Sequence, residues 1–146
     1  MLEAFSTPRN VIRTLILLAV CGLLAVAAGV LGIADNPPGL LSAFLSAGAF
    51  FLAFTHPWRT SRQFLHLLYA SGLGIVVFAV LHNVFEAMAW RLSDSSLLHG
   101  FLGGLGGVFF LIAILVCPPG LLVGAIGAGV MSARKRNQPP PVRWNG

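Results

Sequence analysis

Residues 14–34 read TLILLAVCGLLAVAAGVLGIA, and this run contains no charged side chain. A helix of about 20 apolar residues crosses the roughly 30 Å hydrocarbon core of a membrane. The run is also longer than the apolar core of a cleaved signal peptide. We therefore predict that residues 14–34 form a retained transmembrane helix.

The composition of the whole chain favours the same solvent. Of its 146 residues, 57% are hydrophobic and 9% are charged, whereas a soluble domain carries roughly 25% charged residues. A soluble fold also interrupts its apolar runs, because its surface faces water. The sequence predicts an all-α integral membrane bundle.

Three further apolar runs follow the first, separated by polar or proline-containing segments. We predict four transmembrane helices within a domain spanning 14–133, and their expected bounds are 14–34, 38–54, 64–90 and 98–131. A segment 1–13 precedes this domain, and a basic, proline-containing tail 134–146 follows it. Both flanking segments are expected in the cytoplasm.

The fourth run is too long for one straight crossing. Pro118 and Pro119 remove two backbone donors and clash with the preceding turn. We expect a single helix kinked at these prolines. The alternative ends the span near Val116 and lays residues 121–131 along the membrane surface.

The basic residues predict the orientation of the four helices. Positively charged loops stay in the cytoplasm of a bacterial inner membrane. If both termini are cytoplasmic, that side holds eight of the nine basic residues, and only Arg91 lies outside. We expect anionic lipid to attract five of them, namely Arg59, Arg62, Arg134, Lys135 and Arg136. Nucleic acid is not an expected partner, because its binders array cations along one folded face.

Polar residues in the third predicted helix form the candidate site. His82 and Glu86 are four residues apart and share one face, with Asn83 beside them and Ser71 about three turns earlier. Ionisable groups inside a span usually face a bundle interior or a wet cavity. With Trp90 at the interface, Glu86 lies about 6 Å below it. The pair is either a His–Glu hydrogen bond that joins helices or a proton-coupled site.

A metal site is a weaker alternative at the same end. His82 and Glu86 have the spacing of two ligands, and Asp94 and His99 follow in the next loop. A bis-histidine haem is not expected, because His66 and His82 lie on nearly opposite faces. We therefore predict neither metal nor haem as a cofactor.

Small residues at four-residue spacing predict close helix packing. The packing candidates fall in the first and fourth helices, and they are Ala25, Gly29, Gly103, Gly107, Gly120 and Gly124. Such spacing lets two helix backbones approach closely. We expect these faces to pack the first helix against the fourth, with enough small residues left to serve a partner protein.

The short loops and few polar residues within the spans favour a non-catalytic accessory subunit or assembly factor of a larger membrane complex. One alternative is a small proton- or cation-coupled transporter or channel that uses Glu86 and His82. Another is an intramembrane enzyme that handles a cofactor or lipid. No phosphate loop or Ser/His/Asp set is present, so an enzyme is the less favoured of these hypotheses.

Overall fold

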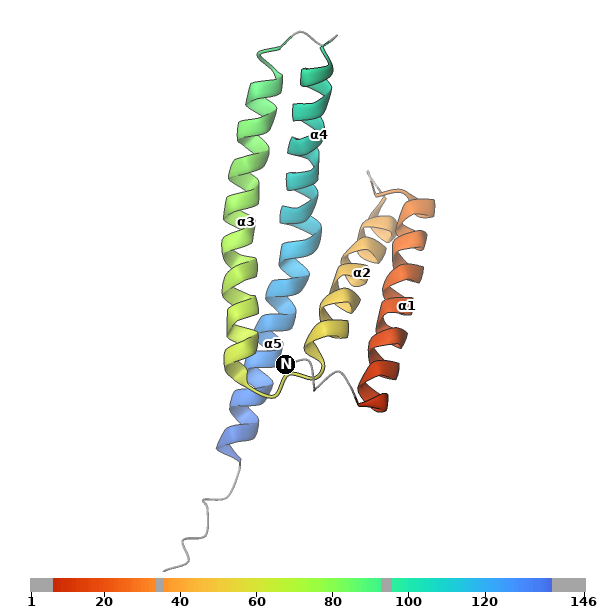
Figure 1. Cartoon of the computed structure of the whole chain (residues 1–146), viewed down its shortest axis with the longest axis vertical. Helices are drawn as coiled ribbons and strands as arrows, with labels where there is room; N and C mark the ends of the chain where they lie inside the picture. The colour runs from red at the N-terminus through yellow and green to blue at the C-terminus, as the bar shows by residue number, and fades with distance from the viewer. Residues whose placement is uncertain (1–6, 34–35, 93–95, 138–146) are drawn as a thin grey trace, which may run out of the picture.

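The structure, a computed structural model, describes residues 7–33, 36–92 and 96–137. In chain order these form α1 (Pro8–Leu31), α2 (Pro37–Thr55), α3 (Ser61–Ala89), α4 (Leu97–Leu111), the π-helical turn η2 (Ile112–Val116) and α5 (Cys117–Arg136). The last three elements make one continuous helix (Figure 1). Four helices are long and apolar enough to cross a membrane, which confirms the predicted all-α four-helix class.

The first helix ends three residues before its predicted limit. Gly32 has a φ of 81°, a left-handed conformation that glycine adopts without steric cost, and it ends α1 at Leu31. Gly39 in the first turn of α2 lies so close to the Gly32 carbonyl that a Cβ atom there would overlap it. Two glycines therefore make the tight α1–α2 hairpin.

The third helix begins earlier than the apolar pattern predicts. Thr60 and Gln63 form a capping box at its start, in which each side chain satisfies a backbone donor of the other. The helix thereby includes Ser61 to Gln63, which are too polar to be counted in an apolar run. At the fourth span, Ser96 caps α4 by accepting a hydrogen bond from the His99 backbone at 3.0 Å.

The two prolines of the fourth span follow the π-helical turn directly. The Cys117 backbone N–H donates to the Ile112 carbonyl, five residues earlier, so the helix is wider there by one residue. Pro118 and Pro119 have no backbone N–H and so cannot donate the usual helical hydrogen bonds. The wide turn tolerates this loss without ending the helix. The helix then continues to Arg136 and packs along α3, so residues 121–131 extend the fourth span. The predicted tail boundary at 134 falls inside this helix.

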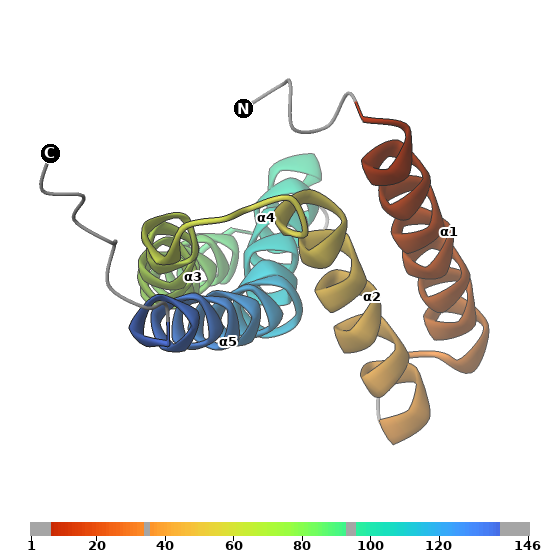
Figure 2. The same ribbon diagram turned by 90° about the horizontal axis from the view of Figure 1, so that it is seen from below.

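The helices form two antiparallel pairs, α1 with α2 and α3 with the long α4–α5 helix (Figure 2). The pairs meet where α2 contacts α5 and η2, and α1 lies at the outer edge. The predicted packing of the first helix against the fourth is wrong: α1 packs mainly on α2. The close approach of Gly32 and Gly39 places α2 beside α1, as is usual for consecutive elements joined by a short connection.

The glycines divide the fourth span into two halves. A Cβ atom at Gly124 would lie 2.7 Å from the Leu68 backbone nitrogen, and at Gly120 it would lie 2.5 Å from Ser71 Oγ. A Cβ atom at Gly127 would overlap the ring of Phe64. In contrast, nothing lies within 4 Å of such an atom at Gly103 or Gly107. Small residues therefore bring α5 against α3, while Gly103 and Gly107 of α4 remain open.

We expect Gly124→Ala to destabilise the protein. The new methyl group would press on the α3 backbone at Leu68, and overpacking of this kind typically costs 1–3 kcal/mol, taken as about 2 here. Gly129→Ala is the matched control on the same helix, because nothing lies within 4 Å of its Cβ position. Thermal unfolding in mild detergent measures both variants. Equal melting temperatures for the two would contradict the close α3–α5 contact.

Candidate functional site

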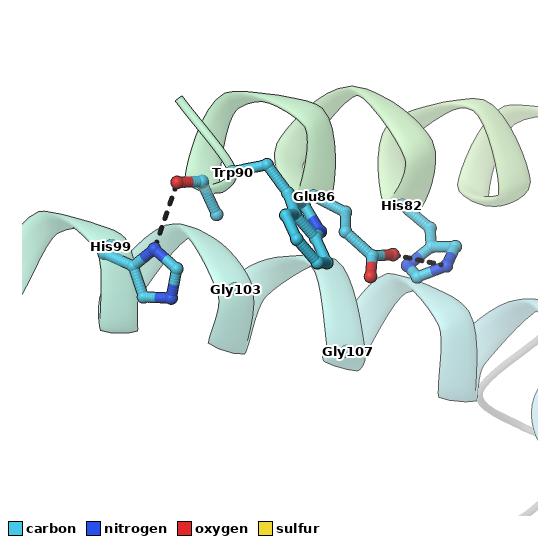
Figure 3. Close-up of a pocket in the computed structure, with 7 residues that line it drawn as sticks. His82, Glu86, Trp90, His99, Gly103 and Gly107 are labelled. Carbon is cyan, nitrogen blue, oxygen red and sulfur yellow. Dashed lines mark hydrogen bonds and ion pairs between the residues drawn. The ribbon is translucent and has the colours of Figure 1, made fainter. Parts of the chain in front are cut away.

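A cavity of about 520 Å³ lies at the far end of the α3–α4 pair. This end projects beyond the α1–α2 hairpin (Figure 1). The cavity is lined by His82, Glu86, Ala89, Trp90, His99, Gly103 and Gly107. Figure 3 shows that α3 supplies the His–Glu pair and Trp90, while α4 supplies His99 and the two glycines. The absence of side chains at those glycines keeps the cavity open.

His82 connects the two helices of this pair. Its Nδ1 atom lies 3.0 Å from the Gly106 carbonyl oxygen of α4. Its Nε2 atom lies 3.1 Å from Glu86 Oε2, the contact drawn in Figure 3. A carbonyl oxygen only accepts, so Nδ1 carries a hydrogen and donates it. A Cβ atom at Gly106 would lie 3.5 Å from the α3 backbone, an ordinary packing distance, so the two helices are in direct contact here.

The contact between His82 and Glu86 joins two groups that can each bind a proton. It is an ion pair when His82 is protonated. With Nδ1 donating to Gly106, a hydrogen bond between Nε2 and the carboxylate requires a further hydrogen on one of the two groups. Glu86 is 50% exposed and His82 24% exposed, so the pair lies near the cavity surface.

Aromatic rings fill the interface below the pair. The ring of Phe110 lies 5.0 Å from that of His82, and Phe109 packs against Phe78 at 5.9 Å and Phe85 at 5.3 Å. These centroid distances are those of ordinary aromatic packing. The cavity is thus open at the outer end of α3–α4 and backed by aromatic side chains toward the middle of the helices.

The other predicted members of the polar cluster lie elsewhere. Asn83 is exposed and donates to the Ala79 carbonyl of its own helix at 2.7 Å. Ser71 is 6% exposed and lies against Gly120, where α3 meets α5. Helical spacing places Ser71 on the correct face but about 16 Å below His82.

The metal candidates are only partly brought together. His99 lines the same cavity as His82 and Glu86, and its Nδ1 atom donates to the Ala89 carbonyl at 3.0 Å. Among the described residues, no three His, Cys, Asp or Glu side chains lie close enough to hold a metal ion. Asp94 lies outside the described residues.

A second charged cleft lies at the opposite end of α3. Its cavity of about 480 Å³ is lined by Arg59, Thr60, Ser61, Arg62, Met131, Arg134 and Lys135. Four of the five predicted lipid-contacting cations therefore meet in one cleft, although they come from distant parts of the sequence. Arg136 does not line it.

The remaining small residues line an apolar groove between the two helix pairs. Ala25 and Gly29 of α1 face it together with Phe50 and Phe51 of α2 and Leu115 of η2. The groove has a volume of about 450 Å³. These small residues of α1 therefore border an open groove, and the buried Ala28 beside them is 3% exposed.

Comparison with known proteins gives no family to which this chain can be assigned, since no family model, curated protein or solved structure matches it. The geometry of the two ends of the bundle therefore carries the functional assignment.

Sequence reasoning missed the groups that complete the site. The Gly106 carbonyl is a backbone acceptor in a glycine-rich helix, and the sequence carries no signal for it. Trp90 was interpreted only as a marker of the interface, yet it also lines the cavity. A His four residues before Glu does signal their contact, but not the second helix that the His contacts.

We expect His82→Ala to lower the stability of the protein by about 1 kcal/mol, because it removes the hydrogen bond between α3 and α4. Asn83→Ala removes a neighbouring polar side chain whose hydrogen bond stays within α3. Thermal unfolding of both variants in detergent measures the difference. A larger loss for Asn83→Ala would show that the inter-helix bond contributes nothing.

Proposed function

We propose that this protein is a non-catalytic accessory subunit or assembly factor of a larger membrane complex, with the open glycine face of α4 as its docking surface. This face consists of Gly100, Gly103, Gly104 and Gly107. Its occupant is a transmembrane helix of a partner subunit. The observation that carries the proposal is that nothing lies within 4 Å of a Cβ atom at any of these four positions.

The contrast within one long helix supports this assignment. On α5, glycines at the same spacing lie directly against α3. A glycine face of this kind therefore makes close contact when it has a neighbouring helix. Glycines in a helix interior are destabilising by roughly 0.5–1 kcal/mol each relative to alanine. Four such glycines have no neighbour at their Cβ positions in the described part of the chain, so their cost is not offset there. The cost is explained if the backbone of a partner helix packs closely there.

The His82–Glu86 pair adds a polar reason for a partner. Glu86 is half exposed beside this glycine face, and Gly103 and Gly107 line the cavity into which it opens. An ionisable group near the membrane is costly unless water or another protein group satisfies it. A partner helix on α4 would cover the cavity and could donate a hydrogen bond to the Glu86 carboxylate.

We also propose that the basic end of the bundle faces the cytoplasm of a cell inner membrane. The starts of α1 and α3 and the end of α5 lie toward one end of the bundle (Figure 1). The basic cleft lies at this end, while Arg91 follows α3 at the other. Retention of positive charge in the cytoplasm favours this orientation.

Gly103→Leu tests the docking surface. We expect the wild-type protein, purified from native membranes in mild detergent, to elute with a partner membrane subunit in fixed stoichiometry. The leucine side chain should lower the amount of co-eluting partner at least tenfold, because it fills the surface that the partner backbone approaches. Quantitative mass spectrometry of the eluate measures the ratio.

Gly22→Leu on α1 is the matched control, since its Cβ position is also free of neighbours. It should keep the partner, and both variants should melt at the wild-type temperature. A monodisperse homo-oligomer without other subunits, or equal loss with both variants, would reject the proposal.

A second candidate function is proton- or cation-coupled transport. The observation that favours it is the contact between His82 Nε2 and Glu86 Oε2, two groups that can bind a proton, in the lining of an open cavity. The rings of Phe78 and Phe109 stack on each other between α3 and the fourth span, so they would have to separate if transport followed this interface.

Flux in proteoliposomes under a pH gradient tests this second candidate. If Glu86 carries the proton, Glu86→Gln should abolish the flux, because an amide neither binds nor releases the proton at neutral pH. Asn83→Ala, an exposed substitution on the same helix, should leave it unchanged. Flux that survives in Glu86→Gln would sink the transport hypothesis.

A further inference from the structure

The basic cleft at the start of α3 adjoins an apolar groove. The groove has a volume of about 310 Å³ and is lined by Leu52, Thr55, His56, Trp58, Phe64, Val123, Ile126, Gly127, Val130 and Met131. Met131 lines both cavities, so the cluster of cations and the apolar groove are neighbours at this residue.

We propose that this composite cavity binds one anionic phospholipid, with its phosphate in the basic cleft and an acyl chain in the groove. The site is at the opposite end of α3 from the His82–Glu86 pair. The proposal is therefore independent of the docking surface on α4.

The charge of the cleft points to an anion. Arg59 comes from the α2–α3 connection and Arg62 from the first turn of α3, while Arg134 and Lys135 come from the last turn of α5. In the described part of the chain Glu86 is the one carboxylate side chain, and it lies about 36 Å farther along α3 than Arg62. No acidic residue lines the cleft, so its positive charge is not balanced there and would attract an external anion.

The cations are held by ordered backbone rather than by a loose loop. Gln63 Oε1 accepts hydrogen bonds from the Arg59 backbone at 3.3 Å and from the Thr60 backbone at 3.4 Å. The Thr60 hydroxyl also donates to it at 3.0 Å. The first N–H groups of α3, which favour an anion, begin at Ser61 in the same cleft.

The groove distinguishes a lipid from a soluble phosphate. Trp58 and Phe64 pack edge to face at 5.1 Å and form its aromatic wall next to the charged end. Tryptophan prefers this level of a membrane, where an apolar ring meets the headgroups. Ile126 and Val130 extend the groove along α5, and both side chains are more than half exposed.

A buried hydroxyl gives a second, independent indication of a ligand. Thr55 lines the groove and is 3% exposed, yet its Oγ1 atom has no hydrogen-bond partner among the described residues. Buried hydroxyls are normally paired. The ester groups of a phospholipid lie between phosphate and acyl chain, at the level where a hydroxyl in this groove could donate to them.

Lipid binding to single variants tests the proposal. In mild detergent, native mass spectrometry should show that phosphatidylglycerol binds to the full chain at least tenfold more tightly than phosphatidylcholine. Lys135→Gln should weaken phosphatidylglycerol about fivefold, the effect of roughly one basic residue near an anionic headgroup. Arg136→Gln is the matched control, with the same charge removed one residue outside the cleft, and it should change the affinity less than twofold.

Two further measurements separate a lipid from other anions. Ile126→Trp narrows the groove and should weaken phosphatidylglycerol, whereas excess inorganic phosphate should not displace it. Equal losses for Lys135→Gln and Arg136→Gln would mean non-specific surface attraction. Displacement by phosphate, or an unchanged affinity in Ile126→Trp, would also overturn the proposal, because the acyl chain would then contribute nothing. None of these outcomes depends on a partner at α4.

Discussion

The close approach of α5 to α3 determines how the rest of the protein is arranged. Gly124 lies against the α3 backbone near Leu68, and Gly120 lies against the buried Ser71. No large side chain in the described part of the chain is fully buried, and alanines dominate its core. In lipid, where apolar burial gives little driving force between helices, such backbone contact is the main source of packing energy.

This contact places the two chemical ends of the molecule. It holds the start of α3 beside the end of α5, so the cations of both segments share one cleft. At its other end α3 runs beside α4, where His82 reaches the Gly106 carbonyl. The π-helical turn between α4 and α5 lets the long helix pass two prolines and still follow α3 over both contacts.

The two ends differ in how their cavities are bounded. The cavity at His82 and Glu86 has a half-exposed carboxylate and an open glycine face. This arrangement suits a protein helix that can approach closely and supply a hydrogen-bond donor. The basic cleft has an excess of cations and leads into an apolar groove, an arrangement that suits a phospholipid. A membrane subunit held between a protein partner and bound lipid would use both, with little need for a buried core of its own.

The sequence alone determined the solvent, the number of helices and the charge asymmetry, because these depend on local composition. The helix Pro8–Leu31 is long and apolar enough to cross a membrane whatever its neighbours are. Glu86 is within reach of His82 because four residues make about one helical turn. The ends of the helices could be predicted less closely from the sequence. Gly32 and the Thr60–Gln63 capping box act through backbone geometry that hydropathy does not record.

Only the tertiary structure decided which helices meet. A small-residue face is equally compatible with any partner helix, so the spacing of Gly29, Gly107 and Gly124 could not distinguish a groove, an open face and a packed interface. The cleft at Arg62 and Lys135 also could not be predicted from the sequence. These residues are more than seventy positions apart, roughly the whole length of two spans, and only the packing of the helices brings them together.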